Sequence, residues 1–225
     1  MNNQNSVVTK AITYKLLTGS LPGKASALLE YILAANGLFV RGQREGLEVL
    51  FPLAECEVRG ALAKACPFLR LAYPPVEQEL VERMLALARQ ARHPGSAAPV
   101  EILFYLAWER AAGRWRLLIP SQVQEVYSVQ PVPDLPLECE EGFTYGQVLI
   151  EIHSHHHLPA YFSSTDDRDE ATGFRLYGVL GNIFEKPQIR FRVGLHGYFW
   201  PVRAEAVCRL PAGMVDLNAE SDLNI

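Results

Sequence analysis

The chain has 225 residues, of which 49% are hydrophobic and 20% are charged. This composition is typical of one large or two small globular domains and excludes a chain that is disordered throughout. The formal net charge of −4 argues against nucleic-acid binding as the main task, because phosphate contacts need a basic surface.

No apolar run reaches the length of a membrane span, so we expect no membrane partner. The first residues, MNNQNSVVTK, lack the basic region and apolar stretch of a secretory signal. The four cysteines form no CxxC pair, which favours a reducing cytoplasm in which they are ordinary buried thiols.

The first 70 residues are predicted to form a small α+β unit, whose role the sequence does not indicate. In residues 25–35, Leu28 and Leu29 precede Ile32 and Leu33 by four positions, which is helical spacing. Gly37 follows at the place of a helix stop. The segments LFVRG and LEVLFPL then predict two strands around the polar turn QREG.

Residues 71–225 are predicted to form a second domain that begins with a helix over residues 76–92, after Pro74 and Pro75. Its apolar residues recur every four positions, and its acids come early and its arginines late, as the helix dipole favours. We expect an exposed loop over residues 130–142 and a loose acidic C-terminal tail. The predicted strands are EILFYLAW, RWRLLIP, QVLIEIHSH, LYGVLG and IRFRVGL.

The segment EIHSHHHLPAYFSSTDDRDE carries the clearest chemical signal. His153 and His155 lie two positions apart at the end of a predicted strand, so both side chains point to the same face. Two imidazoles on one face can bind one cation at about 2.0–2.1 Å. His157 shares that formal face, but Pro159 is expected to end the strand first, so we interpret His156 and His157 as rim residues.

A third metal ligand is available a few residues later. Ser163 can cap a short helix, and Asp166 in its first turn can turn back to supply a carboxylate. Two histidines and one carboxylate leave one position of a tetrahedral zinc open for water, which is the ligand count of a catalytic site.

A water at such a site needs a general base, and three acids are candidates. Glu101 is the best candidate, because a charged residue at the start of an apolar strand calls for a functional reason. Glu109 and Glu125 are alternatives beside turn or loop sequence.

Glu101, His153-Ser154-His155, Ser163 and Asp166 together resemble the JAMM motif of the JAB/MPN metalloprotease family. The resemblance covers roughly residues 71–205. It implies a mixed, curved β-sheet flanked by helices, as in cytidine deaminases. More narrowly, the chain resembles the A proteins of plasmid-borne PRTRC gene systems.

The resemblance also implies a function. It implies zinc on His153, His155 and Asp166, with Glu101 as general acid/base and Ser163 as a stabiliser of the oxyanion. Relatives cleave isopeptide or peptide bonds after the C-terminal tail of a ubiquitin-like protein, so such a protein or another polypeptide is the expected substrate. No oligomeric state is predicted.

The sequence departs from the family pattern beside Glu101. Two favoured glycines are replaced by Phe104 and Trp108, which are expected to narrow the cleft and to favour a glycine-ended tail. These residues also leave open the alternative that the protein is a non-catalytic scaffold that binds a protein partner. A zinc ion with a purely structural role is a third alternative, although no fourth protein ligand is evident. Ser163 fits a helix cap as well as a catalytic role.

Overall fold

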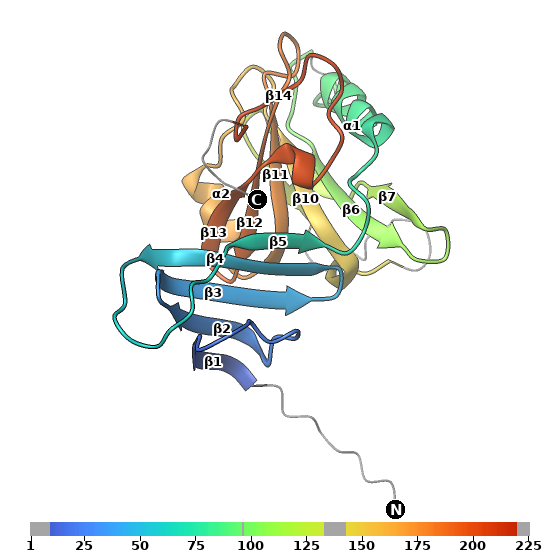
Figure 1. The fold of residues 1–225 in the computed structure, drawn as a ribbon. Helices are drawn as coiled ribbons and strands as arrows, with labels where there is room; N and C mark the ends of the chain where they lie inside the picture. Colours follow the sequence, from blue (N-terminus) through green and yellow to red (C-terminus); the bar gives the residue numbers. More distant parts are fainter. Residues whose placement is uncertain (1–9, 96, 133–142, 220–225) are drawn as a thin grey trace, which may run out of the picture. The chain divides into compact units, whose positions relative to one another are not determined.

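The computed structural model describes residues 10–95, 97–132 and 143–219, which divide into two compact units, Met1–Ala72 and Tyr73–Ile225 (Figure 1). In the first unit the strands form one five-stranded sheet in chain order. The first two strands are parallel and the others are antiparallel. The strands are β1 Lys10–Leu16, β2 Ala27–Ala34, β3 Gly37–Arg44, β4 Leu47–Glu55 and β5 Phe68–Leu71.

The helix predicted over residues 25–35 is wrong, because most of this segment is strand β2. A four-residue spacing is an even number, so it also places side chains on one face of a strand. β2 lies between β1 and β3, and both of its faces carry buried residues, such as Leu29 and Ile32. The described part of the first unit therefore contains strands and no helix, and is not α+β.

Gly37 ends no helix but serves the β2–β3 hairpin. Its φ is 146°, and a Cβ there would lie 2.3 Å from the carbonyl oxygen of Ala54. Only glycine allows this close approach. The two strands predicted around the QREG turn are confirmed as β3 and β4.

A row of charged side chains crosses one face of this sheet. The Arg41 guanidinium is fully buried, donates to Glu48 from Nε at 2.9 Å and from Nη2, and reaches Glu30 from Nη1 at 3.4 Å. The Lys15 ammonium of β1 donates to Glu30 at 2.5 Å. Each buried charge thus has an opposite charge beside it, as a desolvated ion requires.

The second unit is α+β and is built on a curved, mixed sheet of seven strands. The order is β13-β12-β11-β10-β6-β7, and β14 pairs with β12. β10 and β11 are parallel, whereas β10 and β6 are antiparallel. The strands are β6 Leu103–Glu109, β7 Arg114–Leu118, β10 Val148–Ser154, β11 Phe174–Gly181, β12 Gln188–Leu195, β13 Tyr198–Val202 and β14 Val215–Asp216. All five strands predicted in this region are confirmed.

The remaining elements of this unit are short, apart from one helix. The predicted helix over residues 76–92 is confirmed as α1, Gln78–Gln90, with Val81, Met84, Leu85 and Ala88 buried along one face. The other elements are α2 Ser164–Asp169, the 3-10 turns η1 Tyr145–Gln147 and η2 Ala204–Ala206, and a separate hairpin of β8 Gln122–Gln124 and β9 Val129–Pro131. No helix in the described residues is both long and apolar enough to cross a membrane.

Two predicted irregular segments are partly ordered. The stretch at residues 130–142 begins in β9, and residues 133–142 lie outside the described residues. In the tail, Val215 and Asp216 form β14, and the buried Asn218 amide donates to the carbonyls of Phe191 and Val202. Residues 220–225 lie outside the description.

The cysteines do not share one environment. Cys208 is buried as predicted, but Cys56 and Cys66 are exposed, so the expectation of four buried thiols is wrong for these two. Cys139 lies outside the described residues.

The sheet of the second unit leaves no room for a side chain at Gly178 of β11. A Cβ there would lie 2.6 Å from Cε1 of Phe191 and 3.1 Å from Ile152. We expect Gly178→Ala to lower the free energy of unfolding by about 1–3 kcal/mol, since overpacking forces neighbours off their rotamers. Gly146→Ala is the matched control, because its Cβ would meet nothing closer than 3.7 Å. Urea unfolding of both variants measures the difference, and equal stability would contradict this packing.

Candidate active site

Strand β10 places Glu151 and His153 on one face of the sheet, and His155 follows just beyond the strand. The His155 N–H donates to the Leu180 carbonyl at 2.6 Å, which continues the pairing with β11. The two histidines converge, with 3.3 Å between their Nε2 atoms. Two nitrogens bound to one tetrahedral zinc at about 2.0–2.1 Å would lie about 3.3–3.4 Å apart. The pair therefore has the spacing of two ligands to one ion.

The His155 ring is oriented by its surroundings. Its Nδ1–H donates to the Pro159 carbonyl at 3.0 Å, and the ring packs against Tyr161 at a centroid distance of 4.8 Å. A proton on Nδ1 leaves the lone pair of Nε2 free to face His153. Metal-binding histidines use this arrangement to fix their tautomer.

Burial keeps both imidazoles neutral. It lowers the pKa of His153 to about 4, opposed by the Asp166 carboxylate and assisted by His155. Burial also lowers the pKa of His155. A neutral imidazole is the form that binds a metal.

Asp166 lies in the first turn of α2, where Ser163 forms the N-cap. The Ser163 Oγ accepts from the Asp166 N–H at 3.2 Å, and the Asp166 Oδ2 accepts from the Ser163 N–H at 2.5 Å. This reciprocal pair is a capping box. The other oxygen, Oδ1, lies 3.7 Å from the Nε2 of His153. The cap therefore holds the carboxylate beside the histidines.

Arg192 of β12 fastens the short helix α2 to the sheet. Its guanidinium donates to Glu170 at 2.8 Å from Nε and to Asp167 at 2.6 Å from Nη1. The rings of Phe162 and Phe199 each lie 3.9 Å from its Cζ. Because a helix of six residues is not stable alone, these contacts fix where Asp166 lies.

Glu101 approaches the histidines from the segment just before β6. The Glu101 N–H donates to the Glu125 carbonyl at 2.9 Å, and the Glu101 carbonyl accepts from the side-chain amide of Gln124 at 2.8 Å. Its Oε1 lies 3.8 Å from the Nε2 of His155. Ile102, the residue after Glu101, forms two hydrogen bonds with Ser154 of β10. The backbone is thus held from two directions.

The Glu101 side chain is only 5% exposed, and this burial has an electrostatic consequence. Burial, with a smaller contribution from Asp166, raises the pKa of Glu101 to about 8. The two alternative bases lie elsewhere: Glu109 pairs with Arg114 and Arg116, and Glu125 is exposed in the β8–β9 turn. Of the three candidates, only Glu101 faces the histidines.

These groups line a cleft of about 570 Å³. No Lys or Arg is found among the described residues that line it. Burial raises the pKa of Glu170 to about 8 and also raises that of Glu151, so these two carboxyls resist ionisation despite nearby arginines. The lining includes five carboxyl groups and three tyrosines: Glu101, Glu151, Asp166, Asp169, Glu170, Tyr127, Tyr145 and Tyr161.

Phe104 and Trp108 do not narrow this cleft, so that expectation is wrong. Side chains alternate along β6, and Glu101 and Leu103 line the cleft whereas Phe104 and Trp108 face the opposite way. Phe104 is fully buried, and Trp108 stacks on Tyr73 with a centroid distance of 4.7 Å. The two bulky residues belong to packing on the other face.

The two neighbouring histidines also differ from expectation in part. His156 is not a rim residue but is 4% exposed, with its Nε2 buried. His157 is exposed and packs against Phe184 at a centroid distance of 4.9 Å, away from the cleft lining.

Sequence reasoning missed the residues that orient the site, namely Arg192, Tyr161, Gln124 and the Pro159 carbonyl. Arg192 gave one usable signal, because it is a charged residue within the alternating pattern of an apolar strand. The others carry no pattern, since their roles depend on chain segments that only the fold brings together.

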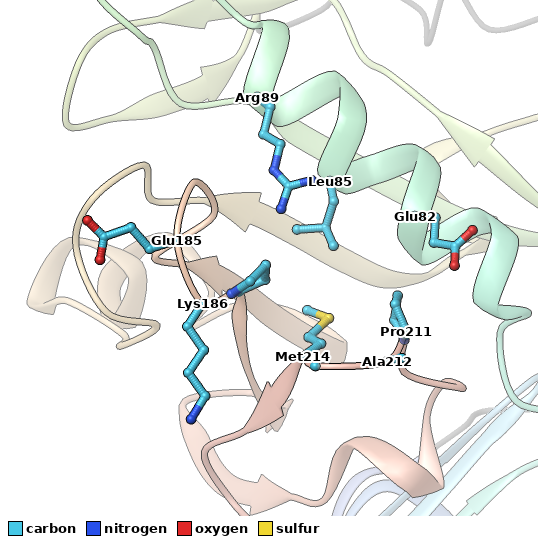
Figure 2. Close-up of a pocket in the computed structure, with 10 residues that line it drawn as sticks. Glu82, Leu85, Arg89, Glu185, Lys186, Pro211, Ala212 and Met214 are labelled. Carbon is cyan, nitrogen blue, oxygen red and sulfur yellow. The ribbon is translucent and has the colours of Figure 1, made fainter.

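A second cavity, of about 330 Å³, lies between α1 and two loops of the same unit. Figure 2 shows Leu85 and Arg89 of α1 on one side of it and Lys186 and Met214 on the other. No histidine or cysteine lines it among the described residues, so it does not share the chemistry of the first cleft.

The described part of the chain contains no group of three His, Cys, Asp or Glu side chains that is already closed around a metal position. The nearest arrangement is the histidine pair with Asp166 beside it. The family model described as prokaryotic homologs of the JAB domain matches residues 77–193, more than half of the chain. No curated protein matches the chain.

The pKa of Glu101 predicts how stability changes with pH in protein freed of metal. The unfolded carboxyl ionises near 4.5, but the buried one stays protonated up to about 8. The neutral form of Glu101 therefore stabilises the fold at pH values below the pKa of the unfolded state, and this contribution is lost as the pH rises through about 8.

We expect Glu101→Gln, which cannot ionise, to gain stability relative to the wild type as the pH is raised from about 5 to about 8. Urea unfolding with a chelator present measures this. Glu79→Gln on α1 is the control, because Glu79 is exposed and should show no such gain. A constant difference between Glu101→Gln and wild type across the pH range would contradict the assignment.

Proposed function

The chain belongs to the family of prokaryotic JAB-domain homologues, and we propose that it is a zinc-dependent peptidase or isopeptidase. One observation carries the proposal: the Nε2 atoms of His153 and His155 converge at 3.3 Å in a cleft that also contains the buried Glu101. This combination of a ligand pair and a buried acid suits metal-assisted hydrolysis.

The donor set fits zinc. His153 and His155 supply two neutral nitrogens, and Asp166 supplies the third ligand through Oδ1. That oxygen lies 3.7 Å from His153 Nε2, a few tenths of an ångström more than the spacing of two ligands on one tetrahedral zinc. Oδ2 can keep its bond to the Ser163 N–H meanwhile. Three protein ligands leave one position open, as catalytic sites do.

A bound zinc would polarise the scissile carbonyl and lower the pKa of water. Glu101 accepts the proton of the attacking water and passes it to the leaving amine. A divalent cation close to Glu101 also favours its carboxylate form, which a base requires and which burial alone disfavours.

Ser163 has room for two roles. Its Oγ accepts from the Asp166 N–H, and a hydroxyl that accepts one bond still has its own proton to donate. We assign that proton to the oxyanion of the tetrahedral intermediate.

The substrate that we propose is a polypeptide, specifically the extended C-terminal tail of a ubiquitin-like protein. A cleft of about 570 Å³ lined by tyrosines can accept a few residues of an extended chain. This part of the proposal rests on family membership and not on any narrowing by Phe104 or Trp108.

The metal assignment predicts which histidines matter. We expect about one zinc per chain, lost in His153→Ala and in His155→Ala and retained in His157→Ala. His157→Ala is the matched control, because its ring lies on Phe184 and not in the cleft. Elemental analysis of the purified variants decides the matter, and unchanged zinc in both of the first two would end the assignment.

The base assignment separates binding from chemistry. Glu101→Gln should retain zinc but lower kcat on a ubiquitin-like fusion by about 100–10,000-fold, since a general base is removed and no ligand is. Ser163→Ala should lower kcat by about 100–1,000-fold and stability by about 1 kcal/mol. Cleavage is followed by mass spectrometry. Near-normal turnover in Glu101→Gln would refute its role, whereas zinc-loaded wild type that cuts no such fusion would favour a scaffold.

A further inference from the structure

Strand β1 forms a free edge of the first unit. It pairs in parallel with β2 over its whole length, and no other strand in the described residues pairs with it. Its register with β2 is constant, so the edge carries no bulge, and its sequence KAITYKL contains no proline. Natural sheets use such devices to protect an exposed edge, and β1 has neither.

The backbone groups on the outer side of β1 belong to Ile12, Tyr14 and Leu16. The N–H of Leu17 donates to the Leu33 carbonyl at 2.9 Å, which points Leu17 toward β2. Because backbone direction alternates along a strand, the odd-numbered residues of β1 face β2 and the even-numbered ones face outward.

The same three residues also expose apolar side chains. The exposed fractions are 47% for Ile12, 79% for Tyr14 and 64% for Leu16. Tyr14 stacks on Tyr31 of β2 with a centroid distance of 5.2 Å. Of the two lysines of β1, Lys15 has its charge directed to Glu30, and Lys10 is the first residue of the strand. The edge thus combines an apolar stripe with backbone groups that no strand in the described residues pairs with.

We propose that this edge is a dimer interface, in which β1 pairs antiparallel with β1 of a second copy about a two-fold axis at Tyr14. In this register Tyr14 faces Tyr14 of the second copy, and Ile12 faces its Leu16. Thr13 faces Lys15, so no lysine lies opposite a lysine. All the outward N–H and C=O groups of the three residues find partners.

The self-complementary pattern identifies a second copy as the partner. Every apolar residue of the stripe meets another apolar residue, and two Tyr31–Tyr14 stacks join into one aromatic row across the axis. The two sheets become one sheet of ten strands. The interface is remote in sequence from the cleft residues and does not depend on the proposed hydrolysis.

The first test is the oligomeric state of the full chain. Sedimentation velocity and light scattering over a wide concentration range should give a dimer for the wild type. Tyr14→Glu places two carboxylates face to face and should halve the measured mass. Tyr127→Glu is the matched control, since Tyr127 is 76% exposed but lies in the other unit, and it should stay dimeric. Circular dichroism checks that each variant folds.

The second test fixes the register. Directly opposed Cα atoms of a hydrogen-bonded antiparallel pair lie about 5.5 Å apart, within disulfide reach. Tyr14→Cys, in a background of Cys56→Ser, Cys66→Ser and Cys139→Ser, should therefore form a disulfide-linked dimer on mild oxidation. Leu28→Cys, which is 47% exposed on β2, should not. A wild type that is monomeric at every concentration, or a dimer that survives Tyr14→Glu, would overturn the proposal.

Discussion

The candidate site depends on one buried cation, Arg192. Asp166 sits on a helix of six residues, which has too few internal hydrogen bonds to keep its place. Arg192 supplies what is missing, because it binds two acids of that segment, Asp167 and Glu170, while two aromatic rings enclose its guanidinium. The planar fork of arginine suits this better than lysine would. A helix too short to stand alone is thereby fixed beside β10.

Burial then decides the chemical state of the groups that meet there. It holds His153 and His155 neutral and keeps Glu101 protonated well above its ordinary pKa. A cation would reverse the last effect and leave the first unchanged, because neutral imidazoles are already in the ligand form. In the site that we propose, the binding of a divalent ion would therefore convert Glu101 from an acid into a base.

The sequence was sufficient where a pattern is local. Alternation predicted the strands of the second unit, and the i, i+2 spacing predicted the shared face of His153 and His155. It failed at β2, where a four-residue spacing suits a helix and a strand equally, and only pairing with neighbouring strands decides. It also failed for Phe104 and Trp108. Glu101 and Leu103 line the cleft, so residues an odd number of positions from them face the other side of the sheet, and family likeness alone does not reveal this.

In the zinc site that we propose, Asp166 would be a helix cap and a metal ligand at once. Its two oxygens do separate work: Oδ2 closes the capping box with Ser163, and Oδ1 points toward His153. The bond to the Ser163 N–H removes rotational freedom from the carboxylate before any ion arrives, so little side-chain entropy remains to be lost on binding. The same bond holds Ser163, which also lines the cleft. One local motif of four residues, the capping box, thus orders both the proposed third ligand and the proposed hydrogen-bond donor.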